Sequence, residues 1–462
     1  MSDKEILQFP GDYAIDEALI VGSSGVPINI TRLIQEINIF ENIETPYMSG
    51  SIIITDAAGV AEAMPFLGQE RLIFSLRTPG GNKISFLEYH AIIYNVGFRL
   101  QGSERSQNIL LNFTTLENYR NFRTRVSKSF KGNISDIVRK ILLGKNYLNS
   151  KKPLDLEETR DIRKFVIPNI SPFDAIILLS TEAISKERNS PHYLFYENNY
   201  GFHFHTLDSL LGKGTSAVKH KAVYRYEAPP PGNVSVDPYT LLPTILNWDI
   251  ANNSNSIFNV RSGAYASTLF THDIFNKNIQ KFEFDYIKDS FNKRNSTNQH
   301  RKGYGTVVPQ QKLEDKTVTE YTSSKIFVHP SATNLHSTGI HNNSEKWLQE
   351  GRSRGLSRKF FTLRIETYGN TNVTVGDLIN VQIPSNRPLS TAEAKDSGDR
   401  TLSGRYLITE LHHLVVPSTQ SHSMVMRVMK DSFENEMPVG EVQYKREPRG
   451  MVNNPDPELL AP

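Results

Sequence analysis

One strand-loop-strand unit occurs twice in this chain, and the repeat is the feature that most constrains its fold. Within each copy, apolar residues stand at every second position, which is the period of a half-buried strand. The two copies align without a gap. The equivalent landmarks are Ala91–Val96, Ser103, Ser106 and Phe113 in the first copy and Tyr406–Leu411, Ser418, Ser421 and Val428 in the second. The repeat predicts two similar β-domains on one chain.

Length and composition set limits on what those domains can do. With 462 residues, of which 38% are hydrophobic and 22% charged, the chain is expected to form several globular domains. A net charge of +3 is not typical of a nucleic-acid reader. Cysteine is absent, which excludes disulfides, a thiolate nucleophile and cysteine-ligated metal. We expect neither a signal peptide nor a stable membrane insertion, because no apolar run is long enough.

The first 115 residues have the pattern of several short strands. Ser51–Thr55 and Arg71–Leu76 are rich in branched and aromatic residues, and Pro79-Gly80-Gly81 marks a turn. The pattern then changes. Asn133–Leu143 and Asp174–Ile184 have apolar residues at helical spacing, and Tyr193–Phe204 predicts a hairpin with an Asn/Gly turn.

Strand-like pieces return after a proline-rich connection. We expect strands at Ile245–Trp248, Phe258–Val260 and Lys281–Tyr286, and again from Phe360 onward. Between them, residues 292 to 339 are polar and predict a long loop or an insertion packed on a neighbour. A short helix is expected from Glu345.

The predicted fold class is mainly β with α+β, built from two similar antiparallel tube-like β-barrels, an α/β domain and a polar insertion. The predicted boundaries are 1–115 for the first barrel, 116–215 for the α/β domain, 216–290 and 356–432 for the two parts of the second barrel, 291–355 for the polar insertion with its short helix, and 433–462 for an extended C-terminal tail.

No motif predicts catalysis, a cofactor or a metal. No G-x-S-x-G elbow surrounds any serine. The pair His203 and His205 and the pair His412 and His413 lack H-E-x-x-H spacing and a nearby carboxylate constellation, so structural roles are favoured over metal ligation. The basic run Lys293–Lys302 is typical of a solvated loop, although nucleic acid or an acidic partner protein are alternatives. The chain is therefore not expected to be an enzyme.

Several passages resemble the baseplate hub protein of T-even-like contractile-tailed bacteriophages, which is related to the hub part of secretion-system spike proteins. The passages are Ile39–Ile43 with Pro46–Asp56, Val166–Ile176, Tyr193–Asn198 with Gly201-Phe202, and Val375–Asp377 with Ser403–Ile408. The structural positions that these passages share with the family are Pro46, Gly50, Pro168, Asn169, Pro172, Gly201, Gly376, Asp377 and Gly404.

The resemblance implies a homotrimer whose two barrels per subunit form a pseudo-sixfold ring. Such a ring adapts a six-fold tail tube to a three-fold central spike and leaves a channel for DNA. The implied partners are other copies of the chain, the central spike protein, the tail tube or tube-initiator protein, the baseplate wedge proteins and DNA in transit. The implied location is the tail baseplate of the virion, with assembly in the host cytoplasm.

Two alternative functions stay open. One is the hub of a contractile secretion or injection system with a separate spike, because no regular short repeat follows Lys430. The other is a host-glycan-binding tail protein, which would need a groove lined with aromatic residues and carboxylates.

Overall fold

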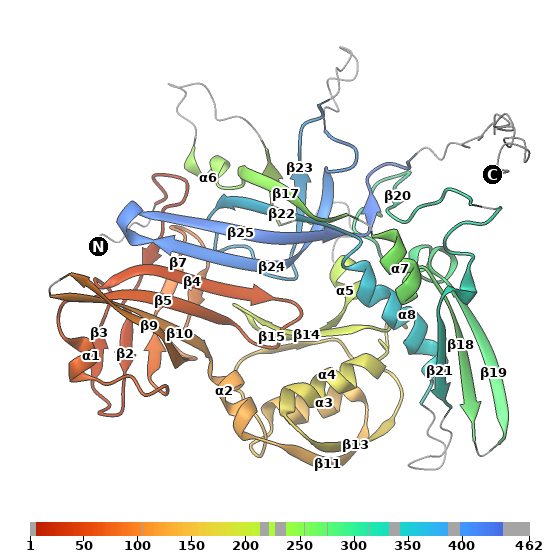
Figure 1. Cartoon of the computed structure of the whole chain (residues 1–462), viewed down its shortest axis with the longest axis horizontal. Helices are drawn as coiled ribbons and strands as arrows, with labels where there is room; N and C mark the ends of the chain where they lie inside the picture. Colours follow the sequence, from red (N-terminus) through yellow and green to blue (C-terminus); the bar gives the residue numbers. More distant parts are fainter. Residues whose placement is uncertain are drawn as a thin grey trace, which may run out of the picture.

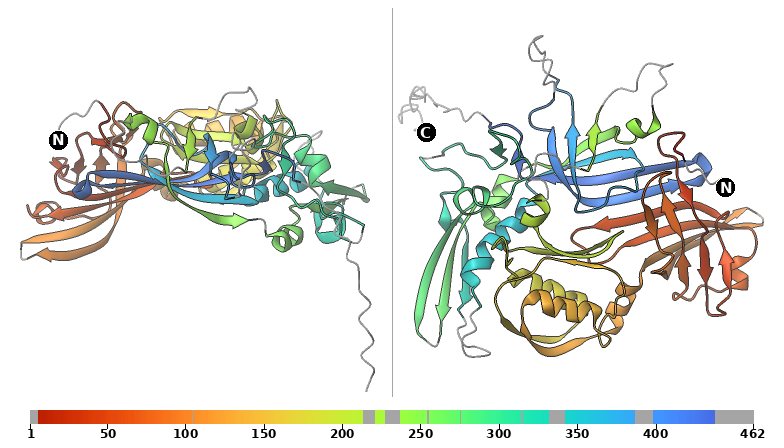
Figure 2. Two further views of the ribbon diagram at one scale, coloured as in Figure 1. Left: turned by 90° about the horizontal axis from the view of Figure 1, so that it is seen from above. Right: turned by 180° about the vertical axis from the view of Figure 1, so that it is seen from behind.

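The computed structural model describes residues 6–103, 105–212, 221–226, 237–253, 255–274, 276–313, 315–331, 342–386 and 398–437. The chain forms a flat, elongated molecule in which strands predominate (Figures 1 and 2). Most of the predicted C-terminal tail lies outside the described residues. No helix among the described residues is long and apolar enough to cross a membrane.

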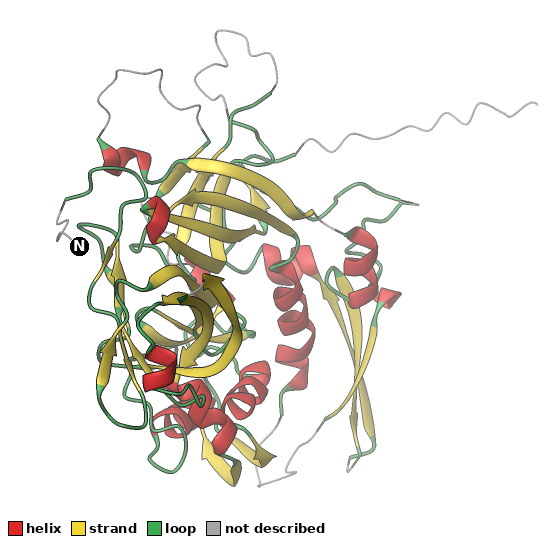
Figure 3. Ribbon diagram, turned by 60° about the vertical axis from the view of Figure 1, so that its left-hand side comes forward, coloured by secondary structure: helices red, strands yellow, loops and turns green. Residues whose placement is uncertain are grey.

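The largest element is a 13-stranded sheet that runs through most of the molecule. Its strands curve strongly (Figure 3). In spatial order its main path is β17 (Ile245–Asn253), β22 (Phe361–Tyr368), β25 (Ser421–Lys430), β24 (Gly404–Val416), β4 (Ile34–Asn42), β5 (Ser49–Asp56), β10 (Ser106–Thr115), β9 (Ala91–Ser103), β6 (Arg71–Ile73), β2 (Leu19–Val21) and β3 (Pro27–Asn29), with β23 (Leu378–Gln382) on β24 and β16 (Val223–Arg225) on β23.

The two copies of the repeat form two hairpins with the same pairing at their centres. Leu111 lies opposite Val96 in β10 and β9, and Met426 lies opposite Leu411 in β25 and β24. Each pair of equivalent residues is separated by the same number of positions, since 426 − 111 = 315 and 411 − 96 = 315. A bulge also falls at the same place, because the ladder skips one residue of β9, Tyr94, and the equivalent residue of β24.

The neighbouring strands are equivalent as well. β5 pairs with β10 as β22 pairs with β25, and β4 pairs with β5 as β17 pairs with β22. The last two ladders also skip one residue at matching positions, Gln35 and Leu246. We call β4-β5-β10-β9 the first four-strand block and β17-β22-β25-β24 the second. The antiparallel pairing of β4 with β24 joins the two blocks into one sheet.

The predicted barrels do not appear as closed structures within the described part of the chain. The sheet is an open path, and β17 is at one end of it. The predicted content of the second barrel also differs from the observed pairing. β18 (Ala266–Asp273) and β19 (Asn278–Asp285) form a separate three-stranded sheet with β21 (Ile326–Pro330).

One further sequence prediction was wrong, and another holds only in part. The expected strand at Phe258–Val260 is part of helix α7 (Ser256–Ser262), which Asn255 caps by accepting a hydrogen bond from the Phe258 N–H. Three apolar residues in a row are too short a signal to distinguish the two structures. The polar stretch from residue 292 is also not an irregular loop throughout, because it contains β21 and β20 (Gly305–Thr306).

The predicted α/β elements are present. α3 (Ile134–Leu143) begins after Asn133, and α4 (Pro172–Glu182) begins with proline at its first position and with Ser171 as its cap. The predicted hairpin is β14 (Tyr193–Asn198) and β15 (Gly201–Thr206). The remaining elements here are α2 (Leu116–Arg123), β11 (Val126–Gly132), β12 (Leu154–Leu156), β13 (Arg163–Ile170) and α5 (Leu207–Gly212).

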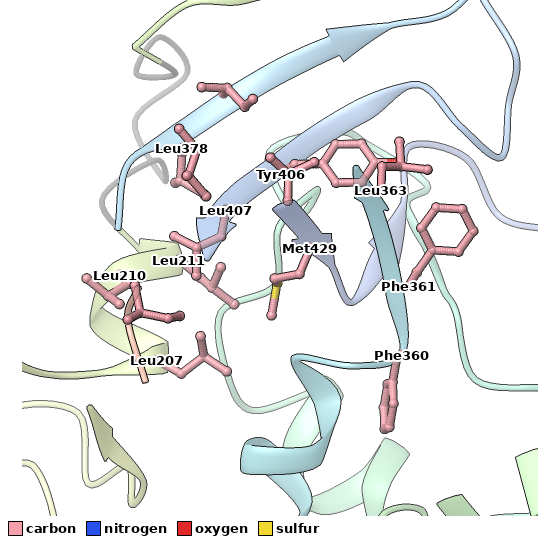
Figure 4. Close-up of a cluster of buried hydrophobic side chains, with 14 of the residues drawn as sticks. Leu207, Leu210, Leu211, Phe360, Phe361, Leu363, Leu378, Tyr406, Leu407 and Met429 are labelled. Atoms are coloured by element: carbon pink, nitrogen blue, oxygen red, sulfur yellow. The ribbon is translucent and has the colours of Figure 1, made fainter. Parts of the chain in front are cut away.

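The described apolar core is divided into three clusters. One lies within the first block and its neighbours, one lies between α3, α4 and the β14–β15 hairpin, and the largest lies under the second block. In the third cluster the leucines of α5 face Leu378 and Leu407 (Figure 4). The predicted short helix is α8 (Ser344–Ser357), which also packs at this end of the molecule.

Short elements complete the description. They are β1 (Ala14–Ile15), α1 (Val60–Ala63), β7 (Ser75–Arg77), β8 (Lys83–Ser85), α6 (Pro238–Leu241), a π-helical turn (Tyr286–Phe291), two 3₁₀ turns (Thr322–Ser324 and Pro417–Thr419) and β26 (Ser432–Phe433).

Candidate functional site

The β14–β15 hairpin lies between the long sheet and helices α3 and α4 (Figure 1). At one end of the hairpin, buried polar groups connect the first block, the hairpin and the turn Val375–Asp377, which precedes β23. We call this region the central junction. It is the candidate functional site because ionisable side chains are buried there together, and such groups are common where a fold carries function.

Glu197 of β14 connects the hairpin to the first block. Its carboxylate accepts hydrogen bonds from the Met48 N–H (3.1 Å) and the Thr115 hydroxyl (2.8 Å) and forms an ion pair with Lys152. Lys152 also pairs with Glu117 at 2.9 Å. Burial alone would lower the pKa of Lys152, but Glu197 and Glu117 together raise it. The cation is thus held between two carboxylates and stays charged.

Glu41 of β4 connects the first block to the turn that precedes β23. Its buried carboxyl accepts hydrogen bonds from the Thr374 hydroxyl and from the Val375 N–H (3.2 Å). Burial raises the pKa of Glu41 to about 7, although these two hydrogen bonds oppose the rise. Asn198 completes the contact from the hairpin by donating to the Val375 carbonyl at 3.3 Å.

Two glycines at the junction allow this close approach. Gly376 has φ +87°, and a Cβ there would lie 2.4 Å from the Tyr196 hydroxyl. Gly201 has φ +123°, and a Cβ there would lie 2.5 Å from the Pro153 carbonyl oxygen. Both positions combine a conformation that side chains rarely adopt with close contact to a neighbouring residue.

The structure distributes the other family-like positions across the fold. Asp377 accepts a hydrogen bond from the Thr374 N–H at 3.1 Å and pairs with Lys221. Pro168 and Asn169 form a bulge of β13 opposite β11, where a proline costs no ladder hydrogen bond. The remaining positions are Pro46, buried before β5; Gly50, inside β5; Pro172, at the start of α4; and Gly404, at the start of β24.

The two histidine pairs have different surroundings. His412 and His413 point to opposite sides of β24: His412 stacks on Phe40, and the His413 Nδ1 lies 3.0 Å from the His422 Nε2. In contrast, His203 and His205 lie beside a carboxylate that sequence reasoning missed. Asp155 of β12 is opposite His203 in a parallel ladder. The sequence-based argument that no carboxylate lies nearby was therefore wrong for this pair.

The missed residues share one weak signal. Asp155 alternates with two leucines in Leu154-Asp155-Leu156, which is the pattern of a short strand with one polar face. Glu41 and Glu197 each interrupt an otherwise strand-like run. Such a pattern identifies a polar residue on a strand, but only the fold shows which distant groups it meets.

The basic run Lys293–Lys302 is not a solvated loop throughout. Thr297 and Asn298 are buried, and Arg294 forms an ion pair with Glu350 of α8. Thr297 donates to Asp431, which pairs with the buried Arg354 of α8 at 3.5 Å. The middle of this segment therefore packs inside the chain, whereas Lys293, Arg301 and Lys302 are exposed.

A cavity of about 300 Å³ opens beside the junction, lined by residues that include Lys152, Glu197 and Glu88. Glu197 and Lys152 are both engaged in hydrogen bonds with each other and with their neighbours. The arrangement is that of a buried ionic contact between parts of the fold, which fixes their relative positions.

Comparisons with known proteins found a sequence relative and a solved structure to which this chain is similar. No protein-family model matches the chain. The chain is 24% identical over 425 residues to the probable baseplate hub protein gp334 of Vibrio phage KVP40, covering 88% of this chain and 92% of that protein. Its fold is similar to the crystal structure of the tail protein from Neisseria meningitidis MC58, with a TM-score of 0.54, 12% identity, and coverage of 91% of this chain and 97% of that one. The resemblance to phage baseplate hub proteins that the sequence motifs predict is thereby confirmed.

Proposed function

We propose that this protein is a structural subunit of a phage tail baseplate hub, located in the virion and without enzymatic activity. The similarity to a probable baseplate hub protein over nearly the whole length of both chains supports this role. The central junction supports it from within the chain, since its ionisable groups connect three parts of the fold.

The observation that carries the finer proposal is the pairing of β4 with β24. β4 is the outer strand of the first block, and β24 is the equivalent of β9. The counterpart of β4 in the second block is β17, and the counterpart of β24 in the first block is β9. In the part of the chain that the structure describes, neither of these two strands pairs with the other block. Among the described residues, β17 pairs only with β22, and the second side of β9 is paired with β6 only at Ala91 and Ile92.

Within the chain, the joint between the blocks is the pairing of β4 with β24. If β17 of one chain paired in the same way with β9 of the next, the chains would close into a ring. In the joint, residues 37–42 of β4 lie beside residues 410–415 of β24. Of these, residues 37–41 and 411–415 are equivalent to residues 248–253 of β17 and 96–101 of β9, each of which includes one extra bulge residue, and the β17 and β9 segments would come from neighbouring chains. Leu100 and Ile250 within these segments are large apolar side chains that the single chain exposes. Pairing would cover them and leave no free strand edge.

A ring of three chains would contain six blocks. The trimer follows from the resemblance to hub proteins, and the two blocks per chain account for a pseudo-sixfold wall. We propose that each block contributes to one tube-like barrel domain, the first within residues 1–115 and the second within residues 216–290 and 356–432 but without the separate sheet of β18 and β19. We further propose that the ring adapts a six-fold tail tube to a three-fold spike around a DNA channel. The proposed partners are the spike, the tube or tube-initiator and the wedge proteins, with assembly in the host cytoplasm.

The test is the oligomeric state of the full chain. Light scattering and native mass spectrometry are expected to give a trimer, and electron microscopy a ring with a central hole. The variant Ile250→Asp places a charge on the exposed side of β17 and is expected to yield folded monomers, because the charge would be desolvated on pairing.

Val328→Asp provides the matched control. Val328 is an apolar strand residue that is more exposed than Ile250, 75% against 45%, but it lies on β21, outside both blocks. This variant is expected to remain trimeric. A wild-type chain that stays monomeric at high concentration would refute the ring, and so would a trimer that tolerates Ile250→Asp.

A further inference from the structure

Asp155, His203 and His205 form a compact group at the outer edge of the β14–β15 hairpin. β12 and β15 are parallel neighbours with Asp155 opposite His203, and His205 is two positions further along the same face. The Asp155 Oδ2 lies 2.9 Å from the His205 Nε2 and 3.5 Å from the His203 Nδ1. One ligand atom from each residue lies within 4.8 Å of the others.

The hydrogen bonds of Asn198 determine which nitrogen of His203 carries a proton. The Asn198 side-chain amide donates to the Val375 carbonyl, and its Oδ1 accepts from the Tyr200 N–H at 2.9 Å. The His203 Nε2 lies 2.8 Å from the same Oδ1 and must therefore be the donor. A neutral His203 consequently points the lone pair of Nδ1 toward the Asp155 carboxylate.

A lone pair directed at a carboxylate is unfavourable unless a cation lies between them. That cation is either a proton, which gives an imidazolium–carboxylate pair, or a metal ion. Metal–nitrogen and metal–oxygen bonds of about 2.0–2.2 Å require donor atoms that are about 3–3.5 Å apart. Of the two separations from the Asp155 Oδ2, the 3.5 Å to the His203 Nδ1 is in this range and the 2.9 Å to the His205 Nε2 is slightly below it. The donor nitrogens of the two histidines lie no more than 4.8 Å apart, and binding a shared ion would require their side chains to rotate toward it.

The surroundings match those of protein metal sites. Metal-bound histidines donate their second ring N–H to an oxygen, which fixes the ring. His203 has Asn198 in this position, and the His205 Nδ1 faces the Glu157 carboxylate at 4.0 Å. Glu157 is in turn held by the Thr206 N–H (2.8 Å) and hydroxyl (2.9 Å). Both histidines are buried, whereas the Asp155 side chain is 56% exposed and leaves access for an ion.

We propose that Asp155, His203 and His205 bind one divalent transition-metal ion of the zinc class. Two imidazoles and one carboxylate suit Zn²⁺, Fe²⁺, Co²⁺ or Ni²⁺ rather than Mg²⁺ or Ca²⁺, which prefer all-oxygen ligands. The ion crosslinks β12 to β15 beside Asn198, the residue that contacts the turn before β23. It therefore stiffens the hairpin where the three cores meet. The site does not depend on the ring described above.

The test uses untagged full-length protein that has been treated with a chelator and dialysed. Titration with Zn²⁺ is expected to give one ion per chain and a higher melting temperature, and Co²⁺ should produce the visible absorption of nitrogen and oxygen ligands. Mg²⁺ should produce neither effect. Asp155→Asn, at an exposed position, is expected to weaken Zn²⁺ binding at least tenfold while the apo protein keeps its melting temperature.

A second ligand variant and a control variant test whether the loss of Zn²⁺ binding is specific to this site. His205→Gln is expected to weaken binding in the same way, whereas His412→Gln, which alters a histidine outside the site, should leave Zn²⁺ binding unchanged. Failure of the wild type to bind Zn²⁺ stoichiometrically would overturn the proposal, as would equal binding by Asp155→Asn. If nuclear magnetic resonance showed His203 doubly protonated in the presence of excess Zn²⁺, the proton rather than the metal would be the cation.

Discussion

The two four-strand blocks have the same backbone plan but different surroundings. Their central hairpins share register and one bulge, so the plan is set by alternation along the strands. They differ in strands that have a free edge. β9 has an additional bulge at Gly97 and β17 has one at Ala251, and neither bulge has an equivalent in β24 or β4, the two strands that pair with each other. Bulges are common on edge strands, where they prevent uncontrolled pairing. Pairing context, rather than local sequence, thus explains the difference.

The two blocks also differ in the sizes of facing core residues. In the first block Gly50 lies opposite Phe113, while in the second block Leu363 lies opposite Val428. A small residue against a large one has been replaced by two of intermediate size. The total volume is similar, which is the kind of substitution that close-packed cores tolerate best.

Each block is held at its end by a different buried ionic contact. The first block is joined to Lys152 through Glu197, which bonds to Met48 and Thr115. The second block continues from β25 into Asp431, which pairs with Arg354. Both contacts connect the end of a block to segments outside it.

The largest expected effect comes from breaking the contact of the second block. Arg354→Met leaves the Asp431 carboxylate buried without its cation and should lower the free energy of unfolding by about 3–5 kcal/mol. Chemical denaturation measures this change. Lys186→Met removes an exposed ion pair with Glu158 and should change the free energy of unfolding far less, because solvent screens that pair. Equal costs in the two variants would show that Arg354 does not hold the second block.

The next effect tests the joint between the blocks through pH. Because the pKa of Glu41 is raised from 4.5 to about 7, the folded state binds this proton more tightly than the unfolded state does. The stabilisation by the protonated carboxyl is complete below pH 4.5 and is lost as the pH rises to 7. The difference amounts to about 3 kcal/mol at most.

Glu41→Gln should remove this component of the pH dependence. The measurement is the free energy of unfolding at pH 5 and pH 8 for both proteins, with the exposed Glu62→Gln as the control. At the corresponding end of β17 stand the neutral residues Asn252 and Asn253, so the effect belongs to the first block alone. An unchanged pH profile would mean that Glu41 is solvated in the folded protein.

A smaller effect is expected from enlarging Gly50, which lies opposite Phe113. A Cβ at Gly50 would lie 2.4 Å from the Phe113 ring and 2.2 Å from the Asn38 carbonyl oxygen. Gly50→Ala should therefore cost about 1–3 kcal/mol by overpacking. Adding Phe113→Leu should recover part of this loss, which thermal denaturation of the single and double variants can measure. Full additivity would argue against direct contact between the two side chains.

The smallest effect concerns the shared bulge. Thr409 bonds through its hydroxyl to the Arg427 carbonyl at 3.0 Å, whereas the equivalent bulge residue of the first block is Tyr94. Thr409→Val should cost about 1 kcal/mol in denaturation experiments. Thr181→Val, on the exposed side of α4, is the control and should cost less. A larger loss at Thr181 would remove any special role for the hydroxyl at the bulge.

The sequence predicts the parts of this fold in which local pattern and packing agree. Alternation identifies both hairpins, and helical spacing with Asn133 and Pro172 identifies α3 and α4. It fails where burial depends on distant residues. Thr297 and Asn298 are buried because Asp431 and Ser432 satisfy their polar groups, which no composition measure reveals. Similarly, nothing local indicates that Asp155 meets two histidines from another strand, or that β18 and β19 leave the long sheet.

The pairing of β4 with β24 has a consequence for assembly. Two separate chains that meet edge to edge lose translational and rotational freedom, which opposes association by several kcal/mol. Within one polypeptide the partners are tethered, so their encounter has a high effective concentration and is independent of dilution. A fused pair can also accumulate substitutions in one half without altering the other. A single gene can therefore present two unlike outer surfaces from one repeated scaffold.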